Sequence, residues 1–394
     1  MTRELVVGIT PLADCAPIAV ALEHGHFARE GLRVRLSREP SWANIRDKLA
    51  TGALDAAHML APMTLAASLG LEPIAEPAVT AFSLGLGGNA ITVSERLRER
   101  LTRAGLPSAA PPEACARALA RLLDEDRAAG RAPLRIATVF PFSMHGYELR
   151  FWLASAGIVP NRDVRLPVVP PPRMVAELEA GAIDGFCVGE PWNSLAELRG
   201  AGSLLVAVED LWSRAPEKVL GVNARWLERN GEIHRALLRA LLAAAHWCDE
   251  AENRPELARL LSTSHYVDAP LETLYRSLAG ASHFHTFCAG DANFPWRSHA
   301  MWIATQMLRW GQIEKPLDLR AAAARVYRAD LYRDAAADLG VPAPREDEKC
   351  ESFGGARFDP ARAAEFATSF AIADLRVASD ELAAAQHAQV TDAR

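Results

Sequence analysis

Short apolar runs alternate with longer amphipathic stretches along the N-terminal part of the chain. Leu5–Thr10 and Val34–Leu36 are β-rich runs, and a helical pattern that ends near Phe27 lies between them. Ser41 is placed to cap a second helix, and Ala56–Leu60 follows as a third apolar run. Alternation of this kind predicts an α/β fold with strands and helices in turn.

The same order of elements occurs a second time further along the chain. Leu49–Pro62 reads LATGALDAAHMLAP and Leu178–Trp192 reads LEAGAIDGFCVGEPW, and a shift of 129 residues aligns their shared Leu, Gly, Ala, Asp and Pro positions. This shift also places Leu5–Thr10 on Leu134–Val139, another β-rich run. A repeated strand–helix–strand–helix–strand unit implies two similar α/β lobes, and two lobes imply a cleft between them.

The segments between and after the two copies complete the predicted lobes. Glycine-rich Ser83–Thr92 indicates a crossing between lobes, residues 94–130 a pair of helices, Asn161–Val169 a strand, and the apolar run from Ser203 a returning strand. Helices dominate afterwards, and the residues from about 378 indicate a solvated, frayed helix. We therefore expect a first lobe of residues 1–92 plus 203–371, a second lobe of residues 93–202, and a C-terminal tail of residues 372–394.

Composition restricts the classes of partner. The 394 residues are 50% hydrophobic and 23% charged with a formal net charge of −6, so neither direct nucleic-acid binding nor attachment to an anionic membrane is expected. No apolar run approaches the roughly 18 residues of a membrane span. The six cysteines form no C-x-x-C pair, which fits a reducing compartment. Met1 leads straight into the first strand without a signal-peptide pattern, so we expect a cytoplasmic protein; the alternative is that a leader was removed.

Polar and aromatic residues follow several predicted strands, at the sheet edge where open α/β sheets bind ligands. Trp42 falls in the first turn of a helix after the second strand, and His145 falls at a helix N-terminus, where N–H groups and the helix dipole favour an anion. Gly189 leaves its backbone open to close approach, and Lys218 ends the loop after the returning strand. Asp14, or the residue after it, is expected to cap the first helix.

Motifs that suggest catalysis lack the partners that the chemistry needs. Glu190, beside Pro191 and Trp192, looks like a catalytic carboxylate, but no second carboxylate is placed for paired acid–base work. The blander alternative is a strand-end residue that bonds the backbone or an arginine across the hinge. Ser143 and His145 share a loop without the G-x-S-x-G pattern of a nucleophile elbow. We expect no catalytic residue, and therefore not an enzyme.

Metal and cofactor motifs are incomplete as well. His24–His26 and His283–His285 each resemble half a metal site without a further ligand at suitable spacing. Ser83–Thr92 has the glycines of a phosphate loop but no G-x-x-x-x-G-K pattern. Trp302 and Trp310 fall near one helical face and are expected to pack rather than to bind a ligand. Neither a metal nor a cofactor is expected.

Several motifs together resemble the nitrate- and bicarbonate-binding proteins of ABC transporters, from residue 5 to about residue 371. The residues that carry the resemblance are Ser41-Trp42, Val139–Pro141 with His145, Val169–Met174, Phe186–Trp192, Leu211-Trp212 with Pro216–Lys218, Trp247–Asp249, Pro295–His299 and Arg309–Gly311. The resemblance implies a type II periplasmic-binding-protein clamshell, in which two α/β lobes close on a small anion in a cleft at the hinge. This fold agrees with the internal repeat.

The resemblance also implies a set of ligand-binding residues for nitrate or nitrite. Carried over motif by motif, they are Trp42, Asn89, His145, Gly189, Glu190 and Lys218. Nitrate has acceptors only, so a site of donors suits it, whereas bicarbonate carries an O–H and needs an acceptor as well. The chain looks nitrate-like at His145 and Lys218. Asn89 stands where the transporter proteins have a longer Gln, a change expected to resize the pocket or admit nitrite.

A member of this family without a leader resembles the cytosolic nitrate/nitrite sensor of a bacterial two-protein antitermination system. The resemblance implies a partner, an RNA-binding antiterminator of the ANTAR class, which the sensor sequesters and releases when nitrate or nitrite binds. One alternative is the solute-binding component of a nitrate ABC transporter. Another is an enzyme on the same fold, such as a pyrimidine-precursor synthase, for which the chain lacks clustered cysteines.

Overall fold

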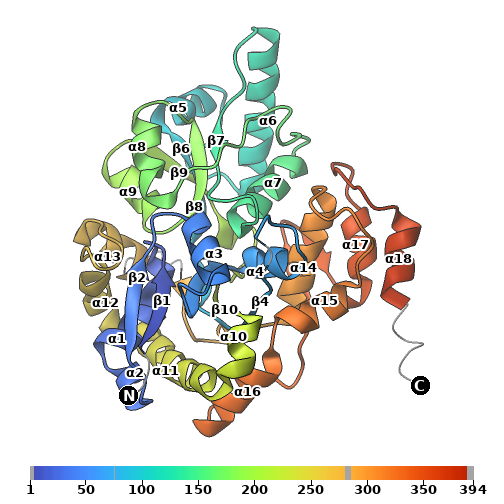
Figure 1. Ribbon diagram of the computed structural model, residues 1–394. Helices are drawn as coiled ribbons and strands as arrows, with labels where there is room; N and C mark the ends of the chain where they lie inside the picture. The colour runs from blue at the N-terminus through green and yellow to red at the C-terminus, as the bar shows by residue number, and fades with distance from the viewer. Residues whose placement is uncertain (1–3, 75, 280–284, 388–394) are drawn as a thin grey trace.

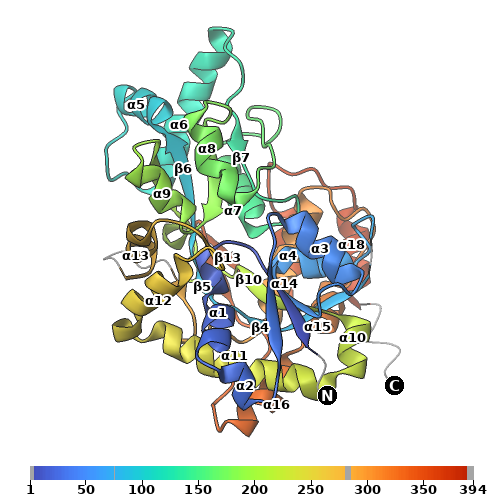
Figure 2. The same cartoon turned by 60° about the vertical axis from the view of Figure 1, so that its left-hand side comes forward.

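The computed structural model describes residues 4–74, 76–279 and 285–387, which form two α/β lobes, each around its own sheet (Figure 1). The first sheet has the order β2 (Val34–Arg38), β1 (Leu5–Ile9), β3 (Ala56–Leu60), β10 (Lys218–Asn223) and β4 (Ala78–Ser83). The second sheet has the order β7 (Ile136–Ala137), β8 (Gly185–Gly189), β6 (Asn89–Ser94) and β9 (Gly202–Ala207). The second lobe stands above the first in both Figure 1 and Figure 2.

The first lobe is built on parallel strands with two antiparallel additions. β1 pairs in parallel with β2 and β3, and β10 pairs antiparallel with both β3 and β4. The helices of the N-terminal segment are α1 (Ala16–Glu23), α2 (His26–Arg29), α3 (Trp42–Ala50) and α4 (Ala61–Ser68). Those of the later segment are α10 (Ala224–Arg229), α11 (Gly231–Asp249), α12 (Arg254–Leu261), α13 (Leu271–Ala279), α14 (Arg297–Arg309), α15 (Leu319–Val326) and α16 (Ala329–Asp338).

The second lobe lies between the two crossings of the chain. Its helices are α5 (Glu95–Arg103), α6 (Pro112–Ala128), α7 (Met144–Ser155), α8 (Met174–Glu179) and α9 (Trp192–Leu198). α5 and α6 are the pair expected for residues 94–130. A short sheet of β5 (Leu86–Gly87) and β11 (His285–Thr286) lies where the chain first leaves the β4 side for β6.

Equivalent hydrogen bonds in the two lobes confirm the internal repeat. The Val6 amide donates to Asp55 Oδ2 at 2.9 Å, and the Arg135 amide, 129 residues later, donates to Asp184 Oδ2 at 2.9 Å. The Asp55 and Asp184 amides return the bond to the carbonyls of Val6 and Arg135, each at 2.8 Å. The aspartate of each copy thus joins the start of its own strand to the strand beside it.

Some predicted strands differ from those observed. Asn161–Val169 was expected to be a strand, but among the described residues it makes isolated bridges instead, from Val164 to Pro160, Arg165 to Arg135 and Val168 to Thr138. Proline cannot donate to a ladder, and Pro167 interrupts this segment. Parts of β6 and β9 were assigned to the first lobe, yet both strands lie in the second sheet. A continuous apolar run fits either buried sheet, so its pattern does not reveal which one it joins.

The C-terminal region packs against the first lobe beside α14 and α15 (Figure 1). It contains the hairpin of β12 (Glu351–Phe353) and β13 (Ala356–Phe358), then α17 (Ala363–Thr368) and α18 (Ser379–His387). The final helix is mostly solvated, as expected, but it is not frayed. Leu382 is fully buried, and Gln386 donates to the Leu317 carbonyl at 2.7 Å, so α18 is docked.

Tryptophan packing forms the core between α14 and the hairpin. The Trp302 and Trp212 rings are 4.8 Å apart, and Phe353 lies 5.2 Å from Trp302, which confirms the expected packing role of Trp302. Within the described ranges, no helix is both long and apolar enough to cross a membrane.

Candidate functional site

Strand ends and helix starts from both lobes meet between the two sheets. The first lobe contributes Trp42 at the start of α3 and Lys218 at the start of β10. The second lobe contributes Asn89 at the start of β6, His145 at the start of α7 and Gly189 at the end of β8. The four side chains named here are buried. The site is therefore enclosed by the two lobes.

Direct contacts between the lobes close the site on one side. The Ala13 amide donates to the Glu190 carbonyl at 2.9 Å, and Trp192 Nε1 donates to the Pro11 carbonyl at 3.1 Å. These bonds join the loop after β1 to the end of β8.

Helix caps position two of the predicted residues; the Ser41 cap was expected, and the Ser143 cap was not. The Ser41 hydroxyl accepts from the Asn44 amide at 3.3 Å, which places Trp42 in the first turn of α3. The Ser143 hydroxyl accepts from the Gly146 amide at 3.1 Å, which places His145 in the first turn of α7. Each cap fixes where its helix begins, and thus where the functional side chain lies.

The structure brings most of the predicted residues into one connected cluster. Lys218 Nζ lies 5.7 Å from the centre of the Trp42 ring, a cation–π distance. On the other side, Lys218 Nζ is 2.6 Å from Glu217 Oε1, which in turn is 3.2 Å from His145 Nδ1. A Cβ placed on Gly189 would lie 3.7 Å from His145 Nε2 and 3.4 Å from Asn89 Oδ1. Glycine at this position thus keeps the space between these side chains open.

Glu190 is placed differently from the other predicted residues. Its Oε2 accepts from the Ser194 amide at 3.2 Å, so the carboxylate lies at the start of α9. Its own amide donates to the Gly88 carbonyl at 2.8 Å. Burial raises its pKa to about 7, against the lowering effect of the hydrogen bonds from Ser194. This arrangement matches the backbone-bonding alternative, with Gly189 as the residue that faces the cluster.

Sequence reasoning missed Asp14, Glu217 and His58. Asp14 Oδ2 lies 2.9 Å from Lys218 Nζ, and its Oδ1 lies 2.9 Å from His58 Nε2. Of the two positions expected to cap the first helix, Cys15 is the N-cap, although it makes no side-chain capping bond, so Asp14 is free for another role. A buried lysine needs a carboxylate partner, and the loop after β1 supplies one. The position of Asp14 after a strand, at the same sheet edge as Trp42, was the available signal.

The pKa shifts separate the charged groups of the cluster from the neutral ones. Burial alone would raise the pKa of Asp14, but Lys218 and His58 outweigh it and lower that pKa far below the ordinary range. Burial would lower the pKa of Lys218, but Asp14 and Glu217 raise it. Asp14 and Lys218 are therefore a buried ion pair. Burial, assisted by the charge of Lys218, lowers the pKa of His145 well below its usual value, so this imidazole is neutral at pH 7.

Two further carboxyls beside the ion pair have raised pKa values. Burial raises the pKa of Glu217, although Lys218 opposes it, and burial together with the charge of Glu217 raises that of Glu148 well above its usual value. Glu148 Oε2 accepts from Asn89 Nδ2 at 2.8 Å. A protonated carboxyl can also donate, so Glu148 can hold the Asn89 amide in either orientation.

Unpaired donors point to a small polar ligand. Across the described residues, Trp42 Nε1 and His145 Nε2 are buried without a hydrogen-bond partner, and so is Asn89 Oδ1. Buried polar groups in folded proteins are almost always hydrogen-bonded, so a cluster of unpaired ones indicates a binding site. Lys218 can add a third N–H beyond its two carboxylate contacts.

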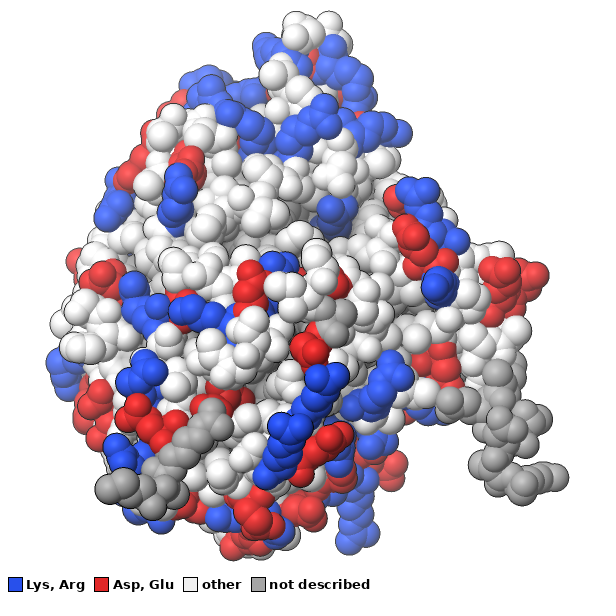
Figure 3. All heavy atoms as spheres, in the orientation of Figure 1, with Lys and Arg blue, Asp and Glu red and all other residues white. Residues whose placement is uncertain are grey.

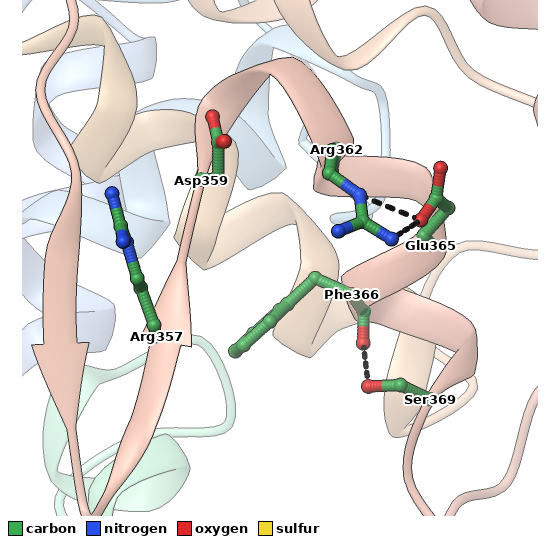
Figure 4. A pocket seen from close by; sticks show the side chains of 6 residues that line it. All are labelled: Arg357, Asp359, Arg362, Glu365, Phe366 and Ser369. Atoms are coloured by element: carbon green, nitrogen blue, oxygen red, sulfur yellow. Dashed lines mark hydrogen bonds and ion pairs between the residues drawn. The ribbon is translucent and has the colours of Figure 1, made fainter.

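Other candidate sites do not join this cluster. The structure holds, over the residues it describes, no group of three or more His, Cys, Asp or Glu side chains able to bind a metal. His283 lies outside the described residues, while His285 packs against Gly88. The cavity of Figure 4, about 420 Å³, lies between β13 and α17, and none of its lining residues belongs to the cluster. Arg362 and Glu365, which line it, pair with each other.

Comparison with known proteins identifies the family of the chain. Residues 1–262 match the model of the NMT1-like family. The chain is 32% identical to the nitrate/nitrite binding protein NrtA of Nostoc sp. over 393 residues, 94% of this chain and 86% of that protein. It is 39% identical to the nitrate import ATP-binding protein NrtC of Synechocystis sp. over 376 residues, 90% of this chain. The chain spans 53% of the length of that protein.

A solved structure agrees with the fold. The crystal structure of the periplasmic nitrate-binding protein NrtA from Synechocystis PCC 6803 superimposes with a TM-score of 0.86 at 29% identity, covering 94% of this chain and 99% of that one. The periplasmic-binding-protein fold expected from the sequence is thereby confirmed.

Proposed function

The chain belongs to the NMT1-like family, and from that premise we propose that it binds nitrate or nitrite between its two lobes. The observation that carries the proposal is the pair of buried, unpaired ring nitrogens, Trp42 Nε1 and His145 Nε2, beside the Lys218 ammonium. The relatives named as nitrate/nitrite binding proteins agree with this ligand class.

Nitrate suits this donor set on chemical grounds. It is a planar monoanion whose oxygens only accept hydrogen bonds, so indole, imidazole and ammonium N–H groups match it. The Lys218 charge stabilises an anion that has lost its water shell. Nitrite has the same acceptors and is smaller, and Asn89, with its short side chain, leaves room for either anion at this position.

The orientation of the Asn89 side-chain amide sets the preference of the site between nitrate and bicarbonate, which carries an O–H. With Nδ2 bonded to Glu148, the unpaired Oδ1 is an acceptor and suits the O–H of bicarbonate. When neutral Glu148 donates to Oδ1 instead, Nδ2 becomes a donor that suits nitrate. We expect the second orientation in the nitrate complex.

Calorimetric titration with nitrate, nitrite and bicarbonate tests the proposal. Trp42→Phe keeps an aromatic ring and removes the N–H, and should weaken nitrate binding by about 0.5–1.5 kcal/mol, roughly twofold to twelvefold. Lys218→Met should weaken it more. Trp247→Phe, at a tryptophan outside the site, is the matched control. Wild-type protein that releases no heat with either nitrate or nitrite would refute the proposal.

The biological setting is proposed separately. The named relatives support a solute-binding component of a nitrate ABC transporter. A cytoplasmic sensor that sequesters an ANTAR-class antiterminator is the second candidate; it is supported by the resemblance noted for the sequence and by the formal net charge of −6, which disfavours direct contact with RNA. Co-purification with such an antiterminator, with and without nitrate, separates the two. A complex that nitrate dissociates supports the sensor, and absence of any complex supports the transporter component.

A further inference from the structure

A second hollow lies between the lobes, away from the nitrate cluster. Its volume is about 720 Å³. Residues from α7 and the loop after it face the end of α14 and the segment before α18; they are Arg150, Val159, Pro160, Asn161, Arg162, Arg165, Trp310, Gln312, Ile372, Ala373 and Asp374. Next to it, the Tyr147 hydroxyl donates to Gln312 Oε1 at 2.6 Å, and Gln312 Nε2 donates to the Pro141 carbonyl at 3.1 Å. These bonds tie the second lobe to the first.

The guanidinium of Arg150 has no anionic partner. It is half-buried, and it makes neither a hydrogen bond nor an ion pair with any residue that the structure describes. Its guanidinium carbon lies 5.5 Å from the centre of the Trp310 ring. Burial lowers the pKa of Arg150, which is the effect expected of a desolvated cation.

A second arginine beside the hollow also lacks an anionic partner among the described residues. Arg309 is 3% exposed, and its guanidinium carbon lies 4.5 Å from the Trp310 ring centre and 3.8 Å from that of Phe370. Nε donates to the Ile372 carbonyl at 3.0 Å, but Nη1 is buried with no partner in the described structure. Burial lowers the pKa of Arg309 to about 9. Trp310 Nε1 is also buried and unpaired there.

Uncompensated buried charge is costly, and aromatic contacts offset only part of the cost. The one carboxylate among the lining residues, Asp374, already pairs with Arg376 at 3.0 Å, and Asp163 pairs with the lining residue Arg162 at 2.9 Å. Arg165 lines the hollow and is exposed. On the face shown in Figure 3, Lys and Arg side chains dominate over the second lobe, whereas both signs mix over the first. The hollow therefore carries a local excess of positive charge.

We propose that this hollow is a second anion site, for a small metabolite that carries a carboxylate or phosphate group. Guanidinium forks bind both groups bidentately, and a volume of this size accepts a ligand much larger than nitrate. The ligand contacts Arg150 of the second lobe and the Trp310 side of the first, so it bridges the lobes. The site shares no residue with the nitrate cluster and does not depend on the proposed function.

Titration of the full chain with inorganic phosphate and with succinate, at ionic strength held constant with chloride, tests this site. Saturable heat with either anion, accompanied by a rise in the unfolding temperature, is the expected result, and the tighter of the two identifies the group preferred. Arg150→Gln should weaken that binding at least about tenfold, the range for a charged hydrogen bond. Arg103→Gln, which removes an exposed arginine on α5, should leave it unchanged.

Two outcomes would overturn the proposal. One is that neither anion binds more strongly than chloride. The other is that Arg150→Gln binds as well as wild type. If Arg150→Gln does not fold, Arg165→Gln at the exposed rim takes its place, with a smaller expected loss. Nitrate titrations of the same samples show whether the first site is intact, so the two proposals fail independently.

Discussion

At the scale of single residues, His145 connects anion binding to protons. Its pKa lies well below the usual value because of burial and the charge of Lys218, so free protein carries a neutral imidazole. A bound anion favours the charged form and raises that pKa, so the complex takes up protons. By linkage, affinity is highest below the pKa of the free protein and falls as pH rises through the window between the free and bound pKa values.

Calorimetry in buffers of different ionisation enthalpy, from acidic to neutral pH, measures this proton uptake. We expect nitrate affinity to fall as pH rises across that window, and the observed heat to depend on the buffer. His145→Gln keeps a hydrogen-bond donor but does not titrate, so it should remove the buffer dependence. Equal proton uptake in wild type and variant would place the titrating group elsewhere.

Single residues also show which parts of the site could be predicted from the sequence. Trp42, Asn89, His145, Gly189 and Lys218 were predicted from motifs, and the structure gathers them. Asp14 and Glu217 were not predicted as site residues, because the partner of a buried charge depends on long-range packing. A local pattern explains Asp14 equally well as a helix cap, and only the burial of Lys218 shows which role it has.

At the scale of elements, the sequence predicted a helix start correctly where a single capping side chain determines it. Ser41 accepts the capping bond of α3, which begins where the sequence placed it, whereas α7 begins at Met144, before the apolar run, because Ser143 caps it. Sheet membership of β6 and β9 was wrong, because an apolar run carries no information about its partner strands. The prediction of an internal repeat was confirmed, because the equivalent aspartates accept a hydrogen bond from the neighbouring strand in both copies.

The end of β8 offers a test at this scale. In Gly189→Ala the new Cβ would lie 3.3 Å from Leu12 Cδ2 and would also enter the space between Asn89 and His145. We expect nitrate affinity to fall at least about tenfold, or about 1.4 kcal/mol, with a loss of unfolding free energy of only about 1 kcal/mol. Gly231→Ala, where a Cβ meets nothing within 4 Å, is the control. Unchanged nitrate binding in Gly189→Ala would remove this position from the site.

At the scale of the whole molecule, the two proposed sites both span the lobes. The first joins Lys218 of the first lobe to His145 of the second, and the other joins Trp310 to Arg150. A ligand at either site favours the arrangement in which the lobes touch. Each ligand therefore lowers the conformational cost of binding the other, which is positive coupling and must be reciprocal.

Reciprocity makes this coupling measurable from both directions. Saturating phosphate or succinate should tighten nitrate binding, and saturating nitrate should tighten the second anion by the same factor, about fivefold or more if the coupling is at least about 1 kcal/mol. Arg150→Gln should abolish the coupling while wild-type nitrate affinity, measured without the second anion, is retained. Gln312→Ala, which removes the bond to Tyr147 across the lobes, should reduce the factor further than any loss of second-anion affinity accounts for. Independent binding of the two anions would show that the lobes do not move as one unit between the sites.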